Sequence, residues 1–439
     1  MGIKRWALLI LAGSVLTGVG IAMVLVFAYR NFPVPGALDG VVRVVTLQRF
    51  PIELRLALVL PLGLLVLGAG LWQLSRALVS PFVKQGEASG DLARIYSRHR
   101  GLPSGETPAV VAVGGGTGLS SLLRGLKKHD LDLTAIVTVA DDGGSTGRLR
   151  SEFDIPAPGD IRNCLAALAD DESLVSRLFQ YRFDQAGSQF DGHSFGNIFI
   201  TALTQVTGSF ERAVTGSASV LNIRGRVLPS TLENVHLAAE LEDGTTIRGE
   251  STVGHHHGRI DRILLEPASP KVYEPAFGAI LNADLIVLGP GSLYTSIAPN
   301  LLIEGISQAI RWSPARIVYV CNVATQPGET DGLDAADHVR VIEELLGAGV
   351  LDDVVVNDNP ASGLAIGPGA PIDPILPDSL RATPHAYRIV ERDVVSDRNP
   401  LRHDPDKLSG VLLELLREPR LAAAPAGEAA TRSLAAARR

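Results

Sequence analysis

The stretch AVVAVGGGTG, residues 109–118, decides the fold prediction. Ala109 to Val113 form a short β-branched run typical of a buried strand, and three consecutive glycines follow directly. A helical pattern begins near Leu119, so the chain passes from strand to helix over a few small residues. Glycines there let the backbone approach a ligand, while free N–H groups and the positive helix end attract an anion. The stretch therefore predicts a strand, a phosphate-binding turn and a helix.

This turn differs from two common glycine-rich nucleotide loops. It lacks the last glycine of G-x-G-x-x-G and has no Walker lysine, which excludes a standard dinucleotide fingerprint and a P-loop. A tight strand-to-helix turn without a ligand is the alternative. The candidate phosphate-binding residues are Gly114, Gly115, Gly116, Thr117 and Gly118.

Strand-like runs and helical patterns alternate along the rest of the chain, which predicts an α/β fold with a parallel sheet. The further strand candidates are Thr134–Val139, Leu285–Leu288, Arg316–Val320 and Val354–Val356. Residues 235–241 and 245–248 flank Asp243-Gly244, the signal of a tight hairpin turn. We therefore predict an inserted β-hairpin region, with Ile260–Glu266 as a candidate third strand.

The N-terminal part of the chain is strongly apolar. Residues 6–29 carry no charge and are long enough for a membrane-spanning helix, and a second apolar run occupies residues 56–74. A cleaved signal peptide explains only the first run. Basic residues outside the two runs predict a cell-membrane protein with two spans and a cytoplasmic main domain. The predicted organisation is a two-helix transmembrane hairpin at 1–75, a linker at 76–107, a folded domain at 108–417 and a disordered tail at 418–439.

The composition limits the classes of partner. The formal net charge is -7, with 40 Lys+Arg against 47 Asp+Glu, and aromatic residues make up 5% of the chain. Such a chain has too few cations and rings for a nucleic-acid surface, so we expect no nucleic-acid partner. Cys164 and Cys321 lie among apolar neighbours, and two cysteines cannot form a disulfide framework or a metal cluster.

An acidic, glycine-rich loop follows the second strand candidate. Residues 141–148 read DDGGSTGR and lie at the carboxyl edge of the predicted sheet, where open α/β sheets bind ligands. One of the two carboxylates is expected to face the crevice, where it would hold a ribose hydroxyl or Mg²⁺. A turn that caps the next helix is the alternative. The candidate ligands are Asp141, Asp142, Ser145, Thr146 and Arg148, and we interpret Arg150 as a surface cation.

The segment PGDIRN, residues 158–163, begins another predicted helix. Asp160 is placed to cap that helix, and capping alone would explain it. Arg162 and Asn163 stand in the first turn, where a cation opposes the helix dipole unless an anion is near. We therefore count Asp160, Arg162 and Asn163 as candidate ligand-binding residues.

Three later segments add candidates. In GHSFGN, His193 and Asn197 share one helical face, although a lone histidine is more often structural. The tract His255–His257 is interpreted as a solvated loop, because consecutive residues cannot converge on one metal. The ends of the fourth and fifth strand candidates supply Gly289, Gly291, Ser292 and Asn322.

The motifs together resemble a known family. VAVGGGTGLSSLLRGLK, TVADDGGSTGRLR, PGDIRNCLAAL, GHSFGN, LGPGSLYTSIAPNLL and CNVATQPGETDG are similar, in this order, to the YvcK branch of the CofD-like family, the gluconeogenesis factors. The resemblance covers roughly residues 108–417. It implies a Rossmann-like three-layer α/β body that binds a nucleotide-linked ligand. Carried over residue by residue, the family's phosphate loop falls on Gly114–Gly118, its acidic loop on Asp141 and Asp142, and its second loop on Gly289–Ser292.

Two functions are compatible with this resemblance. The first is a regulator that binds a UDP-sugar such as UDP-N-acetylglucosamine without turnover. It would be needed for cell shape and for the supply of envelope precursors during gluconeogenic growth. Its expected protein partner is an enzyme of envelope-precursor synthesis, and a homo-oligomer is compatible with this function. The alternative resembles the 2-phospho-L-lactate transferases. It is a Mg²⁺-dependent transferase with a nucleotide-linked donor, in which Asp141 and Asp142 hold the metal and His193 joins them in catalysis.

Overall fold

The computed structural model describes Pro51 and residues 107–169, 174–254, 256, 258–359 and 372–418. Both predicted membrane spans, nearly all of the linker and nearly all of the tail lie outside these residues. Within the described ranges no helix is long and apolar enough to cross a membrane, which contradicts the predicted two-span localisation. The longest described helices have 13 residues, whereas a span needs about 20.

A seven-stranded parallel sheet forms the centre, in the order β10-β9-β8-β7-β1-β2-β3. Every residue of β7, β8 and β9 is buried, as expected for a parallel sheet covered on both faces. The predicted α/β parallel sheet is confirmed, and it fits a Rossmann-like fold. The strands are β1 Ala109–Gly114, β2 Asp132–Val137, β3 Arg226–Pro229, β7 Leu285–Leu288, β8 Arg316–Val320, β9 Asp353–Asn357 and β10 Arg388–Arg392.

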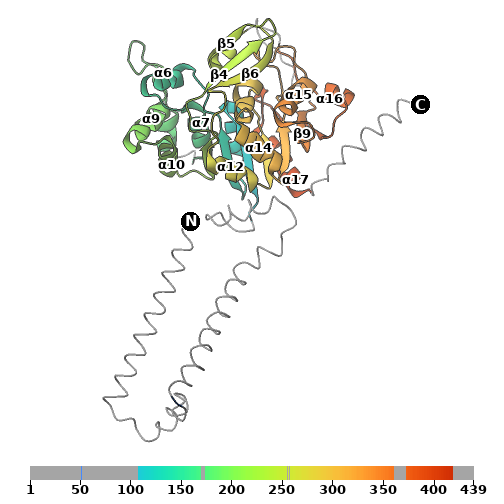
Figure 1. The fold of residues 1–439 in the computed structure, drawn as a ribbon, viewed down its shortest axis with the longest axis horizontal. Helices are drawn as coiled ribbons and strands as arrows, with labels where there is room; N and C mark the ends of the chain where they lie inside the picture. Colours follow the sequence, from blue (N-terminus) through green and yellow to red (C-terminus); the bar gives the residue numbers. More distant parts are fainter. Residues whose placement is uncertain are drawn as a thin grey trace, which may run out of the picture. The chain divides into compact units, whose positions relative to one another are not determined.

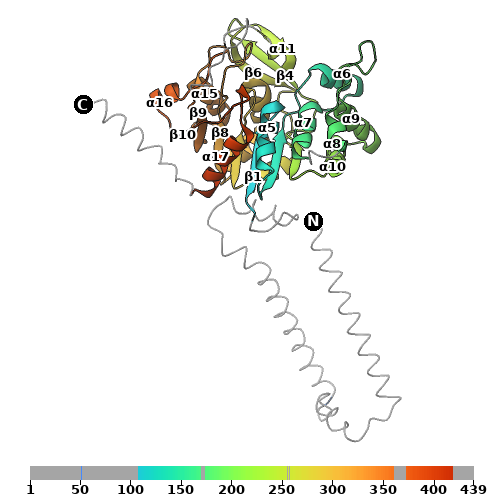
Figure 2. The ribbon, with the colours of Figure 1, turned by 180° about the vertical axis from the view of Figure 1, so that it is seen from behind.

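Helices lie on both faces of this sheet, so the unit has three layers. Figure 1 shows α12 and α14 in front of the strands, and Figure 2 shows α5, α7 and α17 on the opposite face. The helices are α5 Gly116–Leu126, α6 Gly144–Phe153, α7 Gly159–Leu168, α8 Leu174–Gln180, α9 Phe195–Thr207, α10 Phe210–Leu221, α11 Glu250–Val253, α12 Glu274–Leu281, the π-helix η1 Leu293–Ile297, α13 Ala298–Leu301, α14 Glu304–Trp312, α15 Ala335–Leu346, α16 Asp378–Ala382 and α17 Pro405–Arg417.

The strand order creates a crevice between β1 and β7. After β1 the chain builds β2 and β3 on one side, and it then returns to build β7, β8, β9 and β10 on the other. β1 and β7 pair directly, with Val113 opposite Leu288. The glycine-rich segments that follow these two strands therefore leave the sheet side by side, at the point where open α/β sheets bind ligands.

Two antiparallel elements accompany the central sheet. The predicted hairpin is present as β4 His236–Leu241 and β5 Thr246–Arg248, and β6 Ile260–Glu266 pairs with β4 as its third strand. This insert is seen above the sheet in Figure 1. A second hairpin, β11 Val395–Ser396 with β12 Asn399–His403, was not predicted because its strands are short and mostly polar.

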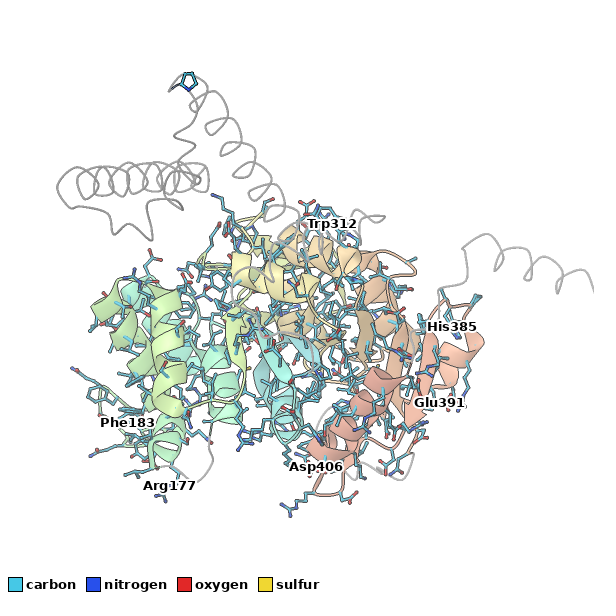
Figure 3. The ribbon with its side chains drawn as sticks, turned by 90° about the horizontal axis from the view of Figure 1, so that it is seen from below. Arg177, Phe183, Trp312, His385, Glu391 and Asp406 are labelled. Carbon is cyan, nitrogen blue, oxygen red and sulfur yellow. The ribbon has the colours of Figure 1, made fainter. Side chains whose placement is uncertain are left out.

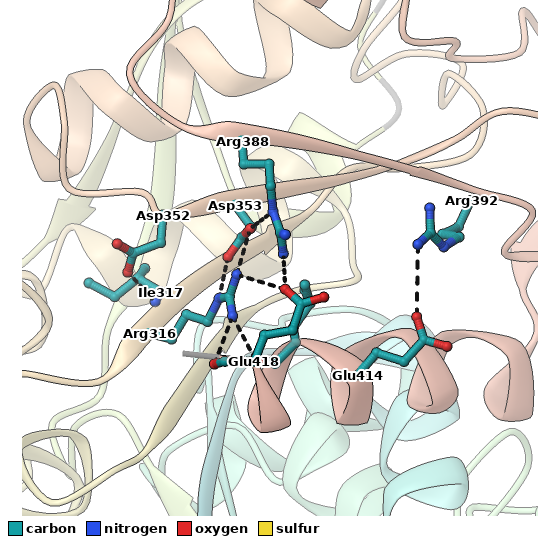
Figure 4. Close-up of polar contacts among 9 residues, drawn as sticks. Arg316, Ile317, Asp352, Asp353, Arg388, Arg392, Glu414 and Glu418 are labelled. Atoms are coloured by element: carbon teal, nitrogen blue, oxygen red, sulfur yellow. Dashed lines mark hydrogen bonds and ion pairs between the residues drawn. The ribbon is translucent and has the colours of Figure 1, made fainter. Parts of the chain in front are cut away.

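A buried ion-pair network joins the C-terminal helix to the sheet (Figure 4). Asp353 on β9 is 1% exposed and accepts hydrogen bonds from Arg316 on β8 and Arg388 on β10. The Arg316 guanidinium also donates to the carbonyl oxygen of Leu415, at 2.7 Å. Because the last carbonyls of a helix have no partner within it, this contact satisfies the end of α17.

Candidate functional site

A cavity of about 360 Å³ opens where the carboxyl ends of β1, β7 and β8 meet. Gly114 ends β1 and Gly289 follows β7, and neither of these two predicted residues is among those that line the cavity. The segment 322–327 after β8 and the strand β12 form its other walls. The predicted site residues that line this cavity are Gly115, Gly116, Thr117, Gly118, Gly291, Ser292 and Asn322.

The two glycine-rich loops pack backbone against backbone. A Cβ atom at Gly118 would lie 2.6 Å from the carbonyl oxygen of Pro290, so only glycine fits without a shift of one loop. Asn300 stabilises the packing of the two loops, because its Nδ2 donates to the carbonyl oxygens of Gly114 and Ser296. The glycines thus have a packing role as well as leaving the N-terminus of α5 open to the cavity.

The carboxylate of Asp160 reaches the first glycine loop. The backbone N–H of Gly116 donates to Asp160, and a Cβ atom at Gly115 would lie 2.5 Å from Asp160 Oδ2. Pro158, and not Asp160, is the N-cap of α7, so the predicted capping of its own helix is wrong. Burial and the nearby Asp141 raise the pKa of Asp160 to about 7.

Asp160 is connected to the other two candidates of its segment. Asn163 Nδ2 lies 3.5 Å from Asp160 Oδ1, and Arg162 donates to Asn163 Oδ1 at 2.7 Å. Arg162 Nε is buried without a hydrogen-bond partner among the described residues. The cation in the first turn of α7 therefore donates to the side-chain amide oxygen of Asn163, and Arg162 is not among the residues that line the cavity.

The adjacent carboxylates Asp141 and Asp142 accept hydrogen bonds from different segments of the chain. Asp141 Oδ1 accepts from the backbone N–H of Gly143 at 2.8 Å, and burial raises its pKa. Asp142 Oδ1 instead accepts from the backbone N–H of Ser251, in the short helix α11, at 2.9 Å. Among the residues the structure describes, no three His, Cys, Asp or Glu side chains are arranged to hold a metal. The two carboxylates therefore have different backbone partners, and the Mg²⁺ site at Asp141 and Asp142 stays a prediction.

Arg150 is 3% exposed, so its interpretation as a surface cation is wrong. Its guanidinium donates to the carbonyl oxygens of Ala140 and Asp141, at 3.2 and 2.9 Å. It also donates to Asn234 Oδ1 and to the carbonyl oxygen of Val235, just before β4. Arg150 thus ties the acidic loop to the β4–β6 insert.

A second polar group lies around Ser145. His193 Nδ1 is 3.1 Å from Ser145 Oγ, and Asn197 Nδ2 donates to Ser145 Oγ and Thr146 Oγ1 at 3.2 and 3.4 Å. Burial and Arg148 lower the pKa of His193. Arg148 itself is exposed and donates to the carbonyl oxygen of Asp191. The predicted residues of this second group therefore lie on α6, on α9 and just before α9, and they are not among the residues that line the cavity.

An aromatic group lies beside this second group. The Tyr181 and Phe183 ring centroids are 5.1 Å apart, and those of Phe183 and Phe190 are 5.4 Å apart. Figure 3 shows Phe183 at the edge of the unit, far from the labelled Trp312 of α14. Of the histidine tract, His256 is the described member, half-buried between α11 and β6.

The second hairpin brings a cation to the cavity. Arg402 on β12 donates to Thr117 Oγ1, beside the N-terminus of α5. Among the described residues that line the cavity, Arg402 alone carries a permanent positive charge. Sequence reasoning missed it, because Thr117 and Arg402 are 285 positions apart and no motif links them.

Comparison with known proteins matches residues 110–395 to the family model of the 2-phospho-L-lactate transferase CofD. The chain belongs to the CofD family. The gluconeogenesis factor of Bacillus subtilis is 47% identical over 320 residues, covering 72% of this chain and 100% of that protein. A Nostoc sp. relative is 45% identical over 425 residues, covering 94% of this chain and 90% of the relative.

A crystal structure of a upf0052-family protein from Bacillus halodurans is also similar. It is 44% identical, has a TM-score of 0.65, and covers 71% of this chain and 100% of its own. The predicted resemblance to gluconeogenesis factors within the CofD family is thereby confirmed.

Two glutamates, Glu250 and Glu329, have carboxyl groups with raised pKa values, and Glu250 lies near the carboxylates of Asp141 and Asp160. Glu329 Oε1 accepts from the backbone N–H groups of Tyr294 and Thr295, at 2.8 and 3.1 Å, and burial raises its pKa to about 7. Burial also raises the pKa of Glu250 to about 8, with Asp141 and Asp160 the strongest neighbouring charges. Glu329 stands in the quoted motif QPGETDG, whereas no sequence signal marked Glu250.

Replacing Glu250 by Gln should make unfolding less dependent on pH. The pKa of Glu250 in the folded protein is about 8, whereas an unfolded glutamate releases its proton near the ordinary pKa of 4.5. Wild-type stability therefore falls as the pH rises through this window. We expect E250Q to match wild type at pH 4 and to be more stable by ~1–2 kcal/mol at pH 8.5, measured by urea unfolding.

The exposed Glu242, in the turn after β4, provides the matched control. E242Q should follow the wild-type stability at both pH values. A constant difference between E250Q and wild type from pH 4 to 8.5 would contradict the prediction.

Proposed function

We propose that this chain is a regulatory protein that binds a UDP-sugar, such as UDP-N-acetylglucosamine, in the cavity between the two glycine-rich loops. The observation that carries the proposal is the cavity itself, which combines the open N-terminus of α5 with Arg402 at the switch point of the sheet. Backbone N–H groups, a helix N-terminus and a guanidinium are the donors that a diphosphate requires.

The remaining lining suits the uncharged part of such a ligand. Asn322 Nδ2 donates to Gln326 Oε1 at 3.2 Å, and Gln326 Nε2 donates to Ser292 Oγ at 2.9 Å. This chain of amides and a hydroxyl offers donors and acceptors for a base and a sugar. The cavity volume is within the range of small-molecule sites.

Binding without turnover is favoured by the residues of the cavity. Its described lining contains no carboxylate, lysine or cysteine, and its one histidine, His403, is held by the carbonyl oxygen of Cys321. Occupancy would instead change the surface formed by residues 325–327 and by β12, which border the cavity. The protein regulated through this surface would be an enzyme of envelope-precursor synthesis, consistent with relatives named gluconeogenesis factors.

Calorimetric titration of the full chain tests this function. The ligands are UDP-N-acetylglucosamine, UDP, GDP and NAD, with and without Mg²⁺, and each mixture is analysed for products. We expect selective binding of the UDP-sugar with no product. Preference for GDP, or absence of UDP-sugar binding, would refute the proposal.

A transferase is the second candidate, and the group around Ser145 favours it. His193, Ser145 and Asn197 are hydrogen-bonded together next to Asp141, and the rings of Tyr181 and Phe183 lie nearby. A flat acceptor could stack on such rings while its hydroxyl approached the polar group. Consumption of a nucleotide-linked donor only when an acceptor is present would identify this activity.

A further inference from the structure

We infer that Nδ1 of His403 accepts a hydrogen bond from the bound nucleotide-sugar and makes the cavity selective for a ligand that presents a donor at that position. The inference rests on the proposed function and adds a specificity residue that no sequence motif indicates. His403 is the last residue of β12, is 8% exposed and lines the cavity.

The hydrogen bond to the neighbouring strand determines which ring nitrogen carries the proton. His403 Nε2 lies 3.1 Å from the carbonyl oxygen of Cys321, directly after β8. A carbonyl oxygen can only accept, so Nε2 must donate. In a neutral imidazole the other nitrogen then has a free lone pair.

The ring stays neutral in this position. Burial lowers the pKa of His403 to about 4, so the Nδ1 lone pair is available near neutral pH. Within the part of the chain that the structure describes, the hydrogen bond of this ring is the one from Nε2 to Cys321, and Nδ1 makes none. A ligand donor would supply that partner, whereas a ligand acceptor would meet an unpaired lone pair.

His403 therefore discriminates in a way that its neighbours do not. Asn322 and Gln326 have amide groups that can present either a donor or an acceptor to a ligand. The fixed His403 ring presents only an acceptor. The matching ligand group is an N–H or O–H, supplied by the imide of a uracil base or by a hydroxyl of the sugar.

Two substitutions separate this role from a structural one. His403→Gln can keep an N–H near the Nε2 position, and so the bond to Cys321, but it removes the acceptor near Nδ1. His403→Asn can keep an acceptor near the Nδ1 position but loses the bond to Cys321. The full chain and both variants are titrated with UDP-N-acetylglucosamine, UDP and N3-methyl-UDP, and their thermal unfolding is measured.

We expect H403Q to bind UDP-N-acetylglucosamine roughly 10-fold more weakly than wild type while it unfolds at nearly the same temperature. H403N should unfold at a lower temperature but keep its affinity within about threefold. If the imide is the donor, wild type prefers UDP over N3-methyl-UDP and H403Q loses this preference. If the sugar is the donor, H403Q loses affinity only for the UDP-sugar.

Other outcomes overturn the inference. Unchanged affinity in H403Q, or a loss in H403N as large as that in H403Q, would show that Nδ1 does not contact the ligand, while the proposed function stands. Absence of UDP-sugar binding by the wild-type chain would refute the proposed function and this inference together.

Discussion

Replacing Asp353 by Asn should destabilise the protein by about 3–4 kcal/mol. Asp353 is 1% exposed and balances two guanidiniums, those of Arg316 and Arg388 (Figure 4). Asparagine keeps the shape but removes the charge, which leaves Arg316, itself 6% exposed, without its buried counterion. Breaking one side of a buried pair is costly because the remaining charge cannot return to water.

The same figure contains the control for this prediction. Arg392 and Glu414 form a pair at 3.9 Å whose side chains are 55% and 61% exposed. Such a surface pair contributes little, so Arg392→Gln should change the free energy of unfolding by less than about 0.5 kcal/mol. Urea unfolding of both variants measures the difference. A loss of under ~1 kcal/mol in D353N would show that water reaches the network.

Replacing Arg402 by Gln should weaken binding of UDP-N-acetylglucosamine by roughly 30-fold, because a charge-assisted hydrogen bond to the diphosphate is lost. The folded state should lose little, since Arg402 is exposed and its described protein contact is the hydrogen bond to Thr117 Oγ1. Calorimetric titration measures the affinity, and thermal unfolding checks the fold.

Arg398, exposed in the turn of the same hairpin, is the matched control. R398Q removes an equal charge at a position that does not line the cavity, so the affinity of this variant for UDP-N-acetylglucosamine should match that of wild type. The affinity of wild type should fall with added salt more steeply than that of R402Q. Equal losses of affinity in R402Q and R398Q would mean that only the net charge of the protein attracts the ligand.

The elements that could be predicted are those with a local signal. The strand, turn and helix over residues 109–126 follow from a β-branched run, small residues and a helical period, and Asp243-Gly244 marked its hairpin. The edge strands β3 and β10 were missed, since they have four and five residues and incomplete burial. The short hairpin β11–β12, which carries Arg402 and His403, was missed as well.

Local motifs predicted which residue types surround the site, but they could not predict which partner each of these side chains contacts. Asp141 and Asp142 are neighbours in the chain, yet one turns to Gly143 and the other to the insert at Ser251. Asp160 was expected to cap its own helix and instead meets Gly116 of α5. Each of these choices depends on which segment the fold places opposite the side chain.

The amino-acid sequence alone specifies the parallel α/β class, the glycine-rich turn and the family, because periodicity, glycine content and motif order are properties of short segments. The folded chain decides that Arg402, 285 positions beyond Thr117, contacts the first glycine-rich loop, and that the His403 ring is hydrogen-bonded to the carbonyl oxygen of Cys321. The reason is physical: strand order and burial bring distant segments to one sheet edge, and only there do their hydrogen-bonding groups select partners.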